Sequence, residues 1–151
     1  GISMTAGISP DSLGRASRDF FLAGTHLLNH PSKSPLPAVF LLARSIELSL
    51  KSILLNSGLS AQVLARKPFG HDLGKLWKEA ASRSSVCDAL SLDQAAAIDV
   101  LTEDYATARL SYIDSSRRYL IPRLELLEET ASNLLRCANS NFQFEIGGLT
   151  C

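Results

Sequence analysis

Three charged residues interrupt an otherwise apolar segment of the chain. Arg44, Glu47 and Lys51 follow one another at intervals of three and four residues, and on a helix this spacing places them on one stripe. Unpaired buried charge is costly, so such a stripe needs partners. Two interpretations remain open. The stripe either faces a groove and holds an anionic ligand, with Glu47 orienting the two cations, or it forms an ion-pair network that fixes the register of the helices.

The same segment also carries three serines, Ser45, Ser49 and Ser52. We interpret them as flanking the charged stripe, so that they widen a polar surface on an otherwise buried helix.

A His-Asp pair, His71-Asp72, opens the next long helical segment. His71 is a candidate general base, and in a ribonuclease Arg66 or Arg109 would stabilise the charge of the phosphate. Adjacent residues on a helix point about 100° apart, so Asp72 and His71 cannot pair closely with each other. The structural alternative is that Asp72 stabilises the N-terminus of the helix while His71 packs or caps.

An arginine lies between two tyrosines further along the chain. Tyr105, Arg109 and Tyr112 are spaced by four and three residues, on one face at the end of a predicted helix. Such a group can stack a base or clamp a phosphate, or it can cover the edge of the core. More arginines follow directly, so this neighbourhood is our preferred site for an anionic partner: Arg117, Arg118 and Arg123.

Histidine spacing offers a metal site as a further alternative. His26 and His30 lie at i and i+4, and together with His71 they would supply three ligands to a catalytic-type zinc. However, no acidic residue lies within a turn on the same face, and a His near a helix C-terminus is favoured by the helix dipole alone. We therefore expect no metal and no other cofactor.

The elements that must position these residues are helices. Their periodicity and caps predict an all-α, up-down bundle of about five helices over residues 9–139, with an apolar second helix at its centre. The caps are Ser9 before Pro10 and a capping box at Ser91-Leu92-Asp93-Gln94. The expected helices cover residues 10–30, the segment after the loop 31–37 as far as 56–58, 71–83, 92 to about 112 and the segment from about 122, with a short helical turn over 60–66. Residues 140–151 form a polar tail.

The order of these motifs resembles the HEPN superfamily. The matching pieces are Glu47-x-x-x-Lys51, Gly70-His71-Asp72-Leu73 and the segment from Tyr105 to Tyr112. The resemblance implies a small helical bundle, typically dimeric, of prokaryotic toxin–antitoxin or defence systems. Many members are metal-independent endoribonucleases, and others act in binding or scaffolding.

The chain departs from the nuclease pattern of that superfamily. Nuclease members carry an Arg followed, after four to six residues, by a His near the end of the bundle. Here the segment from Arg109 to Ser116 contains no His. Arg66 and His71 satisfy the spacing, but they precede the third long helix, where the resemblance implies a fold-related His-Asp-Leu. This departure from the nuclease pattern predicts that the chain resembles the non-catalytic members of the superfamily.

Composition sets the remaining expectations. The 151 residues have zero net charge and three cysteines without Cys-x-x-Cys spacing, which predicts one domain in a reducing cytoplasm, without a disulfide framework. No apolar run is long enough to span a membrane. We interpret residues 1–3, which precede Met4, as a remnant of expression. We expect a homodimer that associates with RNA, a nucleotide or a cognate protein partner. The alternatives are an endoribonuclease toxin that uses His71 and a metal-binding bundle.

Overall fold

The described part of the chain is helical. The computed structural model describes residues 7–30, 34–107 and 116–139, and in these ranges it contains six α-helices, one 3-10 helix and no strand. This confirms the predicted all-α bundle. The elements are α1 (Pro10–Asn29), α2 (Leu36–Asn56), α3 (Ala61–Ala65), α4 (Leu73–Arg83), η1 (Ser85–Ala89), α5 (Leu92–Ala106) and α6 (Leu124–Ala138). The predicted tail, 140–151, lies outside the described residues.

Two helices begin where the local sequence requires it. The side chain of Ser9 accepts a hydrogen bond from the backbone of Ser12, and Ser12 returns the bond, so that α1 starts with a capping box and Pro10 in its first turn. Ser91 and Gln94 form the same reciprocal pair at the start of α5. These local signals need no tertiary contact, and for this reason the sequence alone predicts them.

Other boundaries differ slightly from the prediction. The fourth helix begins at Leu73 rather than at His71, because Asp72 is its N-cap and accepts a hydrogen bond from the Lys75 amide at 3.0 Å. The last helix begins at Leu124 rather than near Pro122. The short helical turn expected over 60–66 is α3, and Ser60 is its N-cap.

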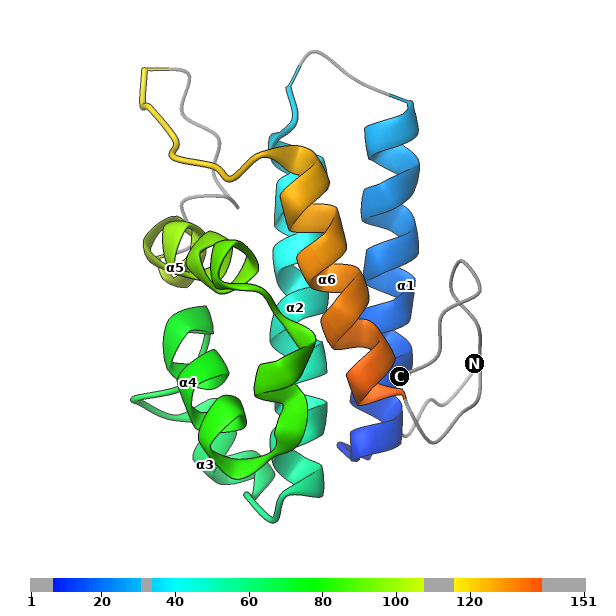
Figure 1. Ribbon diagram of the computed structural model, residues 1–151, viewed down its shortest axis with the longest axis vertical. Coiled ribbons are helices and arrows are strands. Elements are labelled where there is room, and N and C mark those ends of the chain that lie inside the picture. The colour runs from blue at the N-terminus through cyan, green and yellow to red at the C-terminus, as the bar shows by residue number, and fades with distance from the viewer. Residues whose placement is uncertain (1–6, 31–33, 108–115, 140–151) are drawn as a thin grey trace, which may run out of the picture.

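Helix α2 is the centre of the bundle. Fourteen of its 21 residues are buried, and it packs against α1, α4, α5 and α6. Figure 1 shows α1, α2 and α6 along the length of the molecule, with α3, α4 and α5 on the side of α2 away from α1. Among the described helices, none has both the length and the apolar character needed to cross a membrane.

The interface between α1 and α2 is closely packed and contains a small hydroxyl network. A Cβ atom on Gly24 would meet the side chain of Leu42 at 2.9 Å, so this approach requires glycine. Seven residues before Gly24 on α1, the Ser17 hydroxyl donates to the Ser45 carbonyl at 2.8 Å and lies within hydrogen-bonding distance of the Ser45 and Ser49 hydroxyls. We call Ser17, Ser45 and Ser49 the serine cluster.

This arrangement corrects the interpretation of the α2 serines. Ser45, Ser49 and Ser52 are fully buried and do not widen a polar surface beside the charged stripe. At about 100° per residue they point about 140–160° away from Glu47, toward α1. Ser52 also bonds to α1, donating to a backbone carbonyl there at 2.7 Å. The serines and the charges therefore occupy opposite faces of one helix.

Candidate functional site

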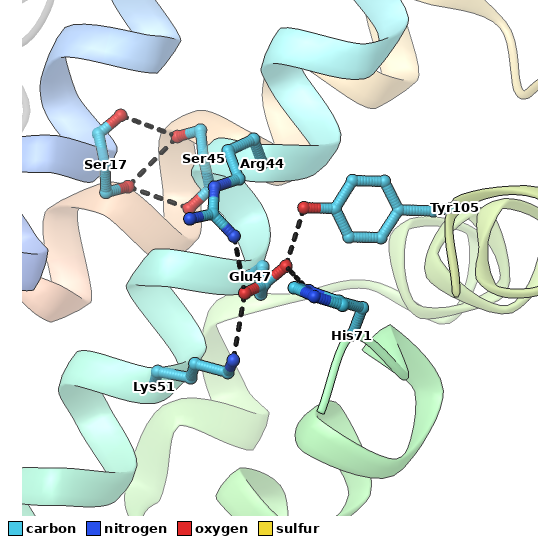
Figure 2. Close-up of polar contacts among 7 residues, drawn as sticks. All are labelled: Ser17, Arg44, Ser45, Glu47, Lys51, His71 and Tyr105. Atoms are coloured by element: carbon cyan, nitrogen blue, oxygen red, sulfur yellow. Dashed lines mark hydrogen bonds and ion pairs between the residues drawn. The ribbon is translucent and has the colours of Figure 1, made fainter. Parts of the chain in front are cut away.

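A single buried carboxylate organises the face of α2 opposite the serine cluster. Glu47 is 1% exposed, and its Oε2 atom accepts from Arg44 Nη1 at 2.8 Å and from Lys51 Nζ at 2.9 Å. Its Oε1 atom lies 2.8 Å from His71 Nδ1 and accepts from the Tyr105 hydroxyl at 2.6 Å. Figure 2 shows these four side chains converging on Glu47 from α2, from the residues before α4 and from α5. We call the five residues the Glu47 cluster.

Burial and hydrogen bonding act against each other on the pKa of Glu47. Burial by itself raises the pKa of a carboxyl group, but hydrogen bonds from Tyr105 and His71 and the charge of Lys51 hold the pKa of Glu47 below its usual value. The carboxylate is therefore ionised at neutral pH. Burial, and then the neighbouring Glu47 charge, raise the pKa of Tyr105, so that its hydroxyl remains a donor.

Arg44 stays charged in the same network. Burial would lower the pKa of its guanidinium, but the charge of Glu47 and the hydrogen bond to Glu47 help to raise it overall. The guanidinium also lies 5.9 Å from the centre of the Phe20 ring, within the range of a cation–π contact. Two cations around one carboxylate leave the cluster with a net positive charge, before any proton on His71 is counted.

The backbone before α4 presents His71 to this carboxylate. Gly70 has a φ of +47°, a left-handed conformation that glycine adopts without strain, and it precedes His71 in a tight turn. An ionised carboxylate has no proton to give, so Nδ1 must be the donor to Glu47. In the tautomer with a single proton on Nδ1, the Nε2 atom carries the lone pair. The His71 side chain is 60% exposed, and within the described residues Nε2 has no protein hydrogen-bond partner.

The charged stripe opens onto a cavity of about 200 Å³. Arg44, Glu47, Lys51 and His71 line one wall. The rest of the lining is apolar and comes from the start of the chain and from α1, α2 and α3: Ile8, Leu13, Leu48, Leu55, Ala61, Leu64 and Ala65. The three charges form an ion-pair network, as one interpretation of the stripe predicts, and they also line a groove. The anionic ligand of the other interpretation stays a prediction.

The Tyr-Arg-Tyr prediction is corrected where the structure describes it. Tyr105 is 6% exposed, and its ring packs edge-on to His71 with the centroids 6.2 Å apart. It therefore has no free face on which a base could stack, and it belongs to the Glu47 cluster instead. Arg109 and Tyr112 lie outside the described residues.

The partners expected around His71 change as well. Asp72 caps α4, which leaves Glu47, 24 residues earlier, as the acid that orients the imidazole. Arg66, the other cation proposed for a His71-based ribonuclease, is exposed at the C-cap of α3 and does not line the cavity. Arg44 and Lys51, rather than Arg66, are the cations that line the cavity together with His71.

The three-histidine zinc alternative is not supported by the structure. In the described ranges no three His, Cys, Asp or Glu side chains are grouped closely enough to hold a metal. His26 and His30 stack on each other, with ring centroids 4.3 Å apart, near the C-terminal end of α1. His71 bonds to Glu47, which lies on α2 between the two serines that contact Ser17 of α1. His26 and His30 lie further along α1 than Ser17, by roughly 14–20 Å at 1.5 Å per residue, so the three histidines are not together.

Comparison with known proteins adds no family to this description. No family model, no curated protein and no solved structure matches the chain. The case for a function therefore rests on the geometry of the Glu47 cluster and its cavity.

The sequence contains one signal for the link between Tyr105 and Glu47. Tyr105 follows Ala97 and Leu101 at intervals of four residues, and all three are buried on the inner face of α5. A tyrosine on a core-facing stripe needs a polar partner for its hydroxyl, and Glu47 is a charged residue on α2, where most residues are buried. The Tyr105 hydroxyl and the Glu47 carboxylate therefore each supply the polar partner that the other needs.

Proposed function

We propose that the protein is a non-catalytic, HEPN-like helical module that binds RNA or a nucleotide through a phosphate group in the cavity beside Glu47. The observation that carries this proposal is the convergence of Arg44, Lys51 and His71 on one wall of an otherwise apolar cavity. A net positive wall beside an apolar floor suits a ligand with an anionic end and a flat, weakly polar body.

The cationic side chains that line the cavity are held in place by Glu47 but keep further N–H donors. Arg44 and Lys51 have five and three N–H donors, respectively, and each uses one bond to reach Glu47. Glu47 keeps both side chains in position before a ligand arrives, which lowers the entropy cost of binding. The cavity is smaller than the roughly 300–1,000 Å³ of sites for drug-sized ligands, so it suits one end of a ligand.

The biological setting of this proposal comes from the resemblance to the HEPN superfamily. On that basis we propose a homodimer that acts in the cytoplasm, in a prokaryotic defence or toxin–antitoxin system, where a cognate protein partner is also expected. Light scattering of the purified protein tests the dimer directly, because a monomeric mass contradicts it.

Salt-dependent binding tests the main proposal. We expect a labelled mixed-sequence RNA and a 5′-mononucleotide to bind, with an RNA affinity that falls steeply as salt increases. Lys51→Gln removes one cation, while its amide still donates to Glu47, and it should weaken binding at least tenfold. The matched control is Lys78→Gln, an exposed lysine on α4 that does not line the cavity. Equal affinities for the two variants would contradict the proposal.

One contact favours a second candidate, the metal-independent endoribonuclease. Glu47 orients His71 through Nδ1, the arrangement by which a carboxylate prepares an imidazole to act as a base. In this candidate mechanism His71 Nε2 takes the proton of the RNA 2′-hydroxyl, and O2′ attacks the adjacent phosphorus. The 5′-oxygen of the next nucleotide then leaves with a proton from water, which produces a 2′,3′-cyclic phosphate.

Cleavage in the presence of EDTA separates the two candidates. The purified protein is incubated with labelled RNA beside His71→Ala and Glu47→Gln. Intact RNA with the wild-type protein is the result that the binding module predicts. Cleavage that is lost in both variants would replace the binding module with the ribonuclease.

A further inference from the structure

A second, wider cavity lies on the other side of His71. It has a volume of about 660 Å³ and is lined by the loop before α4, the first turn of α4 and Ala106 at the end of α5. Two exposed cations, Lys67 and Lys75, border it, and so does the partly buried ring of Phe69. Phe69 packs against the core while also lining the cavity, so its position is fixed.

His71 belongs to both cavities. It lines the smaller one together with Arg44 and Lys51, and the wider one together with Phe69 and Lys75. Because Nδ1 is bonded to the buried Glu47, the ring is held in place where the linings of the two cavities meet. We therefore expect a ligand that fills both cavities to contact this imidazole.

The charge of the wider cavity indicates what class of ligand it would take. Asp72, its acidic residue, accepts a hydrogen bond from the Lys75 amide as the N-cap of α4. The ammonium groups of Lys67 and Lys75 then outnumber this carboxylate, which favours an anion. An aromatic ring beside cations is the combination with which proteins bind single-stranded nucleic acid, by base stacking and phosphate contact.

We propose that the two cavities are adjacent subsites for a single-stranded oligonucleotide. The smaller cavity takes the 5′-phosphate end, held by Arg44 and Lys51, and the wider cavity takes the following nucleotide, held by Phe69 and Lys75. The phosphodiester that joins them lies over His71. This inference rests on the proposed function and names its ligand class: a chain of at least two nucleotides rather than a mononucleotide.

Isothermal titration with three nucleotides tests the second subsite. The probes are AMP, ADP and the 5′-phosphorylated dinucleotide pApA, where ADP adds negative charge without a second nucleoside. We expect pApA to bind at least tenfold more tightly than either AMP or ADP. Phe69→Leu, which keeps an apolar side chain but removes the ring, and Lys75→Gln should each weaken pApA at least fivefold and leave AMP unchanged. Lys51→Gln should weaken all three, and Lys78→Gln none.

The outcomes distinguish this inference from the proposed function. If AMP binds and pApA binds no more tightly than ADP, the second subsite is wrong and the proposed function stands. The same holds if Phe69→Leu and Lys75→Gln weaken AMP and pApA equally. If AMP, pApA and labelled RNA all fail to bind to the folded wild-type protein, the proposed function is wrong, and this inference is wrong with it.

Discussion

Two polar clusters lie on opposite faces of the same buried helix, and they differ in what they leave open. The serine cluster is fully buried between α1 and α2 and is built from neutral hydroxyls that bond to one another and to the backbone. The Glu47 cluster is charged, and its members range from 1% exposed at Glu47 to 60% at His71. Figure 2 shows Ser17 and Ser45 of the serine cluster where α1 meets α2, and His71 and Tyr105 reaching Glu47 from the other direction.

The difference separates a structural network from a candidate site. In the serine cluster every hydroxyl has a partner inside the protein, so nothing remains to bind a ligand. In the Glu47 cluster the carboxylate is satisfied, but its partners have further donors and face a cavity. Burial of polar residues alone is therefore a poor indicator of function. What identifies a site is the donors that remain after the internal bonds are made.

Removal of the central carboxylate should have the largest effect. Glu47→Ala leaves Arg44 and Lys51 without a counter-charge and the Tyr105 hydroxyl without its acceptor. Breaking a buried ion pair costs about 3–5 kcal/mol, and we expect the lower end because the Arg44 side chain is 33% exposed. Urea unfolding followed by circular dichroism measures the change. A loss below about 1 kcal/mol would mean that both cations reach solvent without the carboxylate.

A smaller loss is expected when one hydrogen bond to the carboxylate is removed. Tyr105→Phe keeps the ring but deletes the hydroxyl that donates to Glu47, and hydrogen bonds to charged groups contribute about 1.5–3 kcal/mol. Phe40→Leu is the matched control, because Phe40 packs on the same ring at 6.0 Å without a hydrogen bond to the cluster. Only Tyr105→Phe should raise the pKa of Glu47, as measured by NMR titration of its carboxyl carbon.

A still smaller effect is expected in how the free energy of unfolding depends on pH. The Glu47 cluster should contribute to this dependence, and the serine cluster should not. The pKa of Glu47 is lower in the folded protein than its usual value of 4.5. Its contribution is therefore fully present above about pH 4.5 and is lost as the pH falls through the folded value. The loss is at most about 1.4 kcal/mol per pH unit.

The measurement is the free energy of unfolding between pH 7 and pH 3.5, for the wild type and for Glu47→Gln. The difference between the two proteins should shrink as the pH falls below 4.5. A difference that stays constant over this range would show that the pKa of Glu47 is the same in both states. Variants of the serine cluster should follow the wild-type curve, because their hydroxyls do not titrate in this range.

The sequence predicted what depends on near neighbours. The caps at Ser9 and Ser91, the short helix after Ser60 and the central position of α2 all follow from residues a few positions apart. The bonds from Glu47 to His71 and to Tyr105 span 24 and 58 residues. They depend on how α4 and α5 pack against α2, which no local spacing determines.

Two of the sequence errors have a simple geometric source. The prediction places the serines of α2 beside the charged face, although the helical period puts them on the opposite side. The spacing groups Tyr105 with Arg109, whereas the position of Tyr105 after Ala97 and Leu101 indicates the buried face. In both cases spacing along one stripe is a poor guide unless the stripe that faces the core is also known.

The smallest effect should come from removing two serines together. Ser17→Ala alone leaves the Ser49 hydroxyl buried without the partner it has now, and an unsatisfied buried hydroxyl costs about 1–3 kcal/mol. Ser17→Ala combined with Ser49→Ala removes both hydroxyls, while Ser45 still donates to the Ser17 carbonyl. The double variant should therefore be more stable than the single one, within about 1 kcal/mol of wild type. A double variant less stable than Ser17→Ala would contradict the cost assigned to the unpaired Ser49 hydroxyl, and a loss of nucleotide binding would contradict a purely structural role for the serine cluster.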